Sequence, residues 1–101
     1  MAEDSTEFIE EMNLQQALSS IRALSVSATT FSRALKDVEL AGESARVVQL
    51  LNDEIDSLPD SNTIRFFKVA VRLLHEGMGD PLDISRDAGT VARERGVTIN
   101  F

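Results

Sequence analysis

The side chains that could carry out catalysis are few and scattered along the chain. His75 is the only histidine, and its neighbour Glu76 does not complete a catalytic or metal-binding set. A histidine near the C-terminal end of a helix is favoured by the helix dipole alone, so we expect a structural role for His75. The chain has no cysteine, which excludes disulfides, thiolate zinc sites and cysteine nucleophiles.

Two groups of carboxylates are close enough in sequence to be considered as ligands. Asp80, Asp83 and Asp87 could share a helix face, but their positions are those of a helix cap and first turn. The acids of residues 53–56 lack the ligand spacing and the glycine of a calcium loop. No serine lies in a nucleophile-elbow motif. The sequence therefore predicts no enzyme, no metal site, no cofactor and no small-molecule substrate.

A basic row of three residues is the third candidate site. Arg65, Lys68 and Arg72 recur at helical spacing, so they can lie on one side of a helix. They could contact an anion or an acidic partner, and they could equally form a solvated face with ion pairs inside the chain. Three cations without a nearby Tyr or Trp are a weak indication of nucleic-acid binding.

The charge is distributed unevenly between the two parts of the chain. The net charge is −7 over 101 residues, with −8 in residues 1–60 and +1 in residues 61–101. An acidic surface repels a phosphate backbone, so binding of nucleic acid is not expected. The acidic half could suit a basic protein partner or could serve solubility. No segment has the length and apolar character of a membrane span or a secretory signal, and we expect a cytoplasmic protein.

The most specific pattern in the chain is an apolar heptad seam. Its steps alternate between three and four residues, as in a coiled coil. The members of this seam are Leu14, Ala17, Ile21, Leu24, Ala28, Phe31, Leu35 and Val38. The apolar residues Phe8, Ile9 and Met12 lie off this register, so the seam shifts near the N-terminus. The seam could pack inside the chain or could dock on another protein.

The positions of caps and breakers predict about four helices in a single domain, residues 1–101. The first helix runs over about 5–41 without an internal Pro or Gly and stops at Gly42 in a left-handed conformation. Its weakest stretch is Ser25–Ser27, where a bend would divide it into two helices. Further helices are expected at about 43–57, 61–76 and 81–95, with the helix 61–76 the most buried, and residues 97–101 form a short extended tail.

These elements predict an all-α fold, a small helical bundle with one long N-terminal helix. That helix would measure roughly 55 Å at 1.5 Å per residue, which is more than either of the next two helices could cover. We therefore expect a non-enzymatic interaction or assembly protein that forms a homo-oligomer or docks its seam on a protein partner.

Two other functions are compatible with the sequence. The first is a small acidic inhibitor, a nucleic-acid mimic that binds the basic site of another protein. The second is a DNA-binding regulator, because Ala92, Gly96 and Thr98 resemble the first helix and turn of a helix-turn-helix. The chain ends too soon after Thr98 for a recognition helix, so this second alternative is the weaker one.

Overall fold

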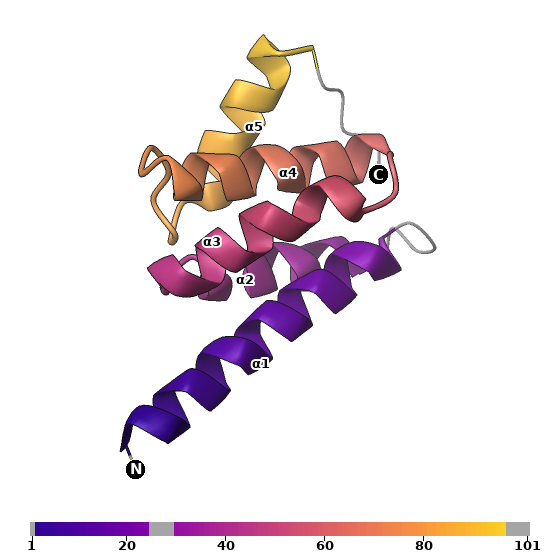
Figure 1. Cartoon of the computed structure of the whole chain (residues 1–101). Helices are drawn as coiled ribbons and strands as arrows, with labels where there is room; N and C mark the ends of the chain where they lie inside the picture. The colour runs from indigo at the N-terminus through magenta and orange to yellow at the C-terminus, as the bar shows by residue number, and fades with distance from the viewer. Residues whose placement is uncertain (1, 25–29, 97–101) are drawn as a thin grey trace.

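The structure, a computed structural model, is helical throughout the part of the chain that it describes (Figure 1). It describes the backbone of residues 2–24 and 30–96 and the side chains of residues 9–24 and 30–96. The helices are α1 (Ala2–Ala23), α2 (Phe31–Ala41), α3 (Ala45–Glu54), α4 (Asn62–His75) and α5 (Ile84–Glu94), and a 3-10 turn, η2 (Ile55–Ser57), continues α3. The all-α class and the helical bundle are as expected from the sequence.

The single helix expected over residues 5–41 is not confirmed, because the chain divides it into α1 and α2. The last turn of α1 closes where the backbone N–H of Leu24 donates to the carbonyls of Ser20 and Ile21, and α2 starts at Phe31. The chain folds back, so α2 lies against α1 (Figure 1). This arrangement removes both halves of the apolar seam from water within one chain, which a single straight helix could not do. The weak stretch Ser25–Ser27 lies outside the described residues.

The next two helices begin at the serine caps that the sequence provides. The hydroxyl of Ser44 accepts a hydrogen bond from the backbone N–H of Val47 at 3.3 Å, and Ser61 accepts one from Ile64 at 3.2 Å. Each bond satisfies an amide that has no partner inside its helix. The helices expected at about 43–57 and 61–76 correspond to α3 with η2 and to α4.

The fifth helix begins later than the expected residue 81. Asp83 occupies the position before the first residue of α5. Asp80, the expected cap, instead accepts a hydrogen bond from the backbone N–H of Leu82 at 2.9 Å and so closes a turn of its own. The helix expected at about 81–95 therefore corresponds to the shorter α5, and the expected tail 97–101 lies outside the described residues.

The core is centred on α4, which lies between α3 and α5 (Figure 1). Half of the residues of α4 are buried, among them Phe66 and Phe67. The ring of Phe31, at the start of α2, lies 5.8 Å from the ring of Phe66 and 5.5 Å from that of Phe67. These ring contacts are worth more than their buried area alone, and they hold the start of α2 against the middle of the bundle.

Gly42 does not adopt the left-handed conformation expected at the end of α2. Its φ of −66° is that of a right-handed helix. A Cβ on this residue would lie 2.9 Å from Cδ1 of Leu74 and 3.3 Å from the carbonyl oxygen of Glu39. The absence of a side chain therefore serves the close approach of α4, and not a turn that requires a positive φ.

Candidate interaction surface

The heptad seam, which the sequence proposes as the interaction surface, lies inside the bundle wherever the structure describes it. Its buried members are Leu14, Ala17, Ile21, Leu24 and Val38. Phe31 and Leu35 are half-buried and pack against the same core, and Ala28 lies outside the described residues. The chain itself thus provides the surface on which this seam packs, chiefly through residues of α2, α3 and α4.

The helix α1 is much longer than the helices that cover it. Its 22 residues span about 33 Å, whereas the 11 residues of α2 and the 10 residues of α3 span about 17 Å and 15 Å. Near the start of α3, Arg46 forms an ion pair of 3.4 Å with Glu10 of α1. Figure 1 shows that the N-terminal turns of α1 extend beyond the other described helices. We call residues 2–12 of α1 the overhang.

The overhang exposes two large apolar side chains near the edge of the bundle. Ile9 is 57% exposed and Met12 is 44% exposed. They lie three residues apart, so they are neighbours on one face of the helix. These two residues are off the heptad register of the seam, and this departure is the sequence signal that distinguishes them from the buried members.

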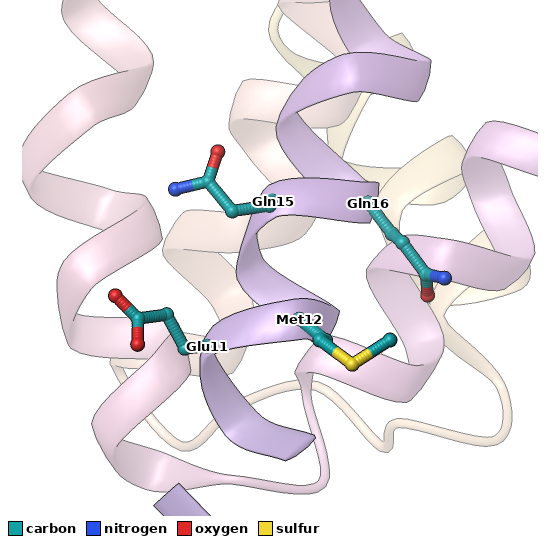
Figure 2. Close-up of a pocket in the computed structure, with 4 residues that line it drawn as sticks. All are labelled: Glu11, Met12, Gln15 and Gln16. Carbon is teal, nitrogen blue, oxygen red and sulfur yellow. The ribbon is translucent and has the colours of Figure 1, made fainter. Parts of the chain in front are cut away.

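A shallow hollow of about 380 Å³ lies beside Met12. The described residues that line it are Glu11, Met12, Gln15 and Gln16, and the lining is mainly apolar. Figure 2 shows that Glu11 and Gln15 project from one flank of α1 while Met12 and Gln16 project from the other. The methylene stems and the thioether form an adaptable apolar surface with polar groups at its rim.

The overhang is also the most acidic part of the chain. Residues 3–11 contain five acids and no base. Within the described side chains, Glu11 is exposed and Glu10 is the partner of Arg46. Acids are stabilising at the positive N-terminal end of a helix, and among the described side chains the exposed Glu11 lies next to Met12 in the sequence.

The basic row on α4 is largely engaged by acids of the same chain. Arg65 donates two hydrogen bonds of 2.7 Å to the two carboxylate oxygens of Asp60. Arg72 forms an ion pair of 2.9 Å with Asp56. Hydrogen bonding to Arg65 lowers the pKa of Asp60 below its ordinary value, and the same contact raises the pKa of Arg65. Lys68, between them, is half-buried.

The remaining polar candidates do not form a catalytic set in the described part of the chain. Nε2 of His75 lies 2.8 Å from the side-chain oxygen of Gln49 at an exposed site. Arg86 lies 3.1 Å from Asp83 and 3.9 Å from Asp87. The described residues contain no group of acids or histidines that could hold a metal ion, and no buried side-chain polar atom without a hydrogen-bond partner.

The segment that resembles a helix-turn-helix ends at the limit of the described residues. Ala92 is buried, as the packing residue of such a motif would be, and Gly96 has the left-handed φ of +80°. Both features also belong to any helix that packs on a core and stops at a glycine. Thr98, the last residue of the pattern, lies outside the described range.

Comparisons with protein-family models, with curated proteins and with solved structures find no match to this chain. Within the residues that the structure describes, no helix combines the length and the apolar character needed to cross a membrane. The candidate surface therefore depends on geometry and charge alone.

Proposed function

We propose that this chain is a non-enzymatic helical interaction protein that docks the overhang of α1 on a protein partner. The observation that supports this proposal is the exposure of Ile9 and Met12 in the first half of α1, a helix whose N-terminal turns extend beyond the other described helices (Figure 1). Two large apolar side chains on a projecting helix lose contact with water when a partner covers them, which favours association.

The fold places the heptad seam inside the bundle, so the exposed surface of α1 lies elsewhere. A seam over 5–41 would exceed what the rest of the chain could cover, but α2 folds back on α1, and the seam members of α1 from Leu14 onward lie in the core. The length difference between α1 and α2 supports the proposal instead. Recognition of an amphipathic helix by a partner requires only a few anchors at helical spacing, and Ile9 and Met12 have that spacing.

Neither alternative function is favoured by a specific contact in the described residues. The acidic-inhibitor hypothesis depends on the negative charge of the first part of the chain, and five of those acids belong to the overhang. A DNA-binding role would use the C-terminal segment, residues 81–101, in which Arg86 is paired with Asp83 and Arg93 and Arg95 are exposed. A homo-oligomer remains one form of the proposed function, in which the partner is a second copy.

Site-specific photo-crosslinking tests the proposal. A photo-crosslinking amino acid replaces Met12 in one protein and Leu50, an exposed leucine of α3, in a control protein. Illumination in the cells that produce the protein should give a discrete crosslinked protein species from position 12 and none from position 50. Introducing Ile9→Ser beside the label at position 12 should weaken that species, because it removes the neighbouring anchor.

Sedimentation of the purified chain identifies the homo-oligomer form of the same proposal. A dimer that Ile9→Ser dissociates, with unchanged helicity, would mean that the partner is a second copy. If position 12 gives no more crosslinking than position 50 and the chain stays monomeric at high micromolar concentration, the proposed function is wrong.

A further inference from the structure

The charge around the overhang narrows the class of partner. Accepting the proposed function, we infer that the partner of the overhang is a basic amphipathic protein surface, a helix in which lysine or arginine flanks an apolar stripe. Its apolar stripe covers Ile9 and Met12, and its cations complement the exposed Glu11 and the negative net charge of residues 3–11.

The sequence around Ile9 and Met12 is negatively charged. Five acids and no base occupy residues 3–11, and Arg46 of α3 compensates Glu10 from the side of the bundle. Glu11, adjacent to Met12, is exposed. A partner that covers Met12 brings its own rim close to Glu11, so cations at that rim are attracted and acids are repelled.

A second copy of this chain is a poor partner for the overhang, because both overhangs are acidic. Two packed helices have axes about 8–10 Å apart, which is about one Debye length at physiological salt. Pairing two overhangs would therefore bring together two segments, residues 3–11 of each copy, that each contain five acids and no base. This repulsion disfavours the symmetric dimer in either helix orientation.

A head-to-tail contact between copies meets the same difficulty. The other strongly exposed apolar side chains are Met78 and Leu82, at 70% and 79% exposure, in the connection between α4 and α5. Asp80 and Asp83 flank Leu82 in that connection. Like charge would thus oppose like charge if this connection of one copy covered the overhang of another.

The exposed apolar surface is narrow and shallow, which favours a helix as the partner. Ile9 and Met12 form a narrow stripe, and the hollow beside Met12 is shallow. Gln15 and Gln16 at its rim can donate and accept hydrogen bonds (Figure 2). A helix with a narrow apolar stripe matches this surface, and the flexible Met12 side chain can adjust to the stripe that it meets.

Two synthetic amphipathic helical peptides test the inference with the full chain. One has leucines on one face and lysines on the other, and the second has glutamates in place of the lysines. Binding is measured by calorimetry, and the contact site is located by NMR shifts of the methyl groups of Ile9 and Met12. The lysine peptide should bind with shifts at both methyls, and the glutamate peptide should not bind.

Variants and salt separate docking from general attraction to an acidic protein. The pair Ile9→Ser and Met12→Ser should weaken the lysine peptide about tenfold, which is the loss of part of the buried apolar area, whereas the matched control Leu50→Ser should not. Raising the salt from about 0.05 M to about 0.5 M should weaken binding to the wild-type chain by roughly tenfold, because it shortens the Debye length.

Each contrary outcome has a distinct meaning. Equal binding of the glutamate peptide, or binding of the lysine peptide that ignores the Ile9 and Met12 variants, overturns the inference about the partner. A dimer that Ile9→Ser dissociates also overturns it but leaves the proposed function in place. A monomer without position-12 crosslinks refutes the proposed function itself, and the inference with it.

Discussion

The hydroxyl of Ser20 on α1 donates a hydrogen bond to the carboxylate of Asp37 on α2. The two residues are 17 positions apart, which would separate them by roughly 25 Å in one continuous helix. Ser20 is the one polar residue that is buried among the described side chains. This bond is therefore direct evidence that α2 folds back on α1.

Replacing Ser20 by Ala should destabilise the chain by about 1–2 kcal/mol, because a partly buried carboxylate loses a hydrogen-bond donor. Urea denaturation followed by circular dichroism measures the change. The matched control is Ser19→Ala, at an exposed neighbouring position, which should change stability by less than about 0.5 kcal/mol. A double-mutant cycle with Asp37→Ala should recover a coupling energy; a coupling near zero would mean that the bond contributes nothing to the packing.

Replacing Ile21 by Asp should unfold the chain. Ile21 is fully buried in the core, and an unpaired charge there costs several kcal/mol, a large part of the total stability of a small domain. Ile9→Asp, on the overhang, should leave the helicity and the melting temperature nearly unchanged. Circular dichroism of the two variants decides the matter. If the Ile21→Asp chain stays folded and only its oligomeric state changes, the seam packs between chains, and the burial of Ile21 within one chain is wrong.

Replacing Gly89 by Ala should stabilise the chain by about 0.5–1 kcal/mol. Gly89 lies inside α5, where alanine is the better helix former, and the nearest atom that a Cβ would meet is Cε2 of Phe66 at 4.0 Å. Gly79→Ala should be destabilising instead, because its Cβ would lie 3.2 Å from Cβ of Leu73 and 3.3 Å from Cδ1 of Ile84. Thermal melts of the two variants should move in opposite directions.

Replacing Glu39 by Gln should raise the melting temperature slightly at neutral pH. Burial raises the pKa of Glu39 above its ordinary value, with a further contribution from Asp83 and an opposing one from Lys36. A carboxyl whose pKa is higher in the folded state favours folding when protonated, and this favourable contribution is lost as the pH rises through the folded-state pKa.

The pH dependence of this Glu39 variant provides the check. The melting temperature of the variant should exceed that of the wild-type chain near pH 7. The difference should shrink below the ordinary glutamate pKa, where Glu39 is protonated in both the folded and the unfolded chain. Melts at a series of pH values measure it. An advantage that grows on acidification would reverse the assigned sign of the shift.

Local sequence was enough to predict the features that depend on neighbouring residues. Ser44 and Ser61 cap α3 and α4 because their hydroxyls reach an amide three residues ahead, a geometry that the backbone alone provides. The apolar density of residues 64–74 likewise indicated that α4 would be central. The left-handed Gly77 and Gly96 follow α4 and α5 where a helix stop was expected.

Local sequence was not enough where the decision depends on contacts between distant residues. A heptad seam predicts that an apolar stripe is covered by another helix. That helix can belong to a second copy, to another protein or to the next part of the same chain. The sequence also predicted the cap of the last helix at Asp80, whereas α5 begins after Asp83. The cap position was decided by the turn at Leu82 and by the ion pairs of Arg86.

The sequence by itself determined that this protein is acidic, helical and without cysteine, and it determined where most of its helices begin. Only the tertiary structure decided that α2 returns along α1, so that Ile21 becomes core while Ile9 and Met12 stay in water. The physical reason is that helix formation depends on residues that are close in the sequence. Burial depends on how much apolar area is removed from water when segments that are distant in the sequence pack together. The helix α2 has half as many residues as α1, and the N-terminal end of α1 is the surface that we propose for a partner.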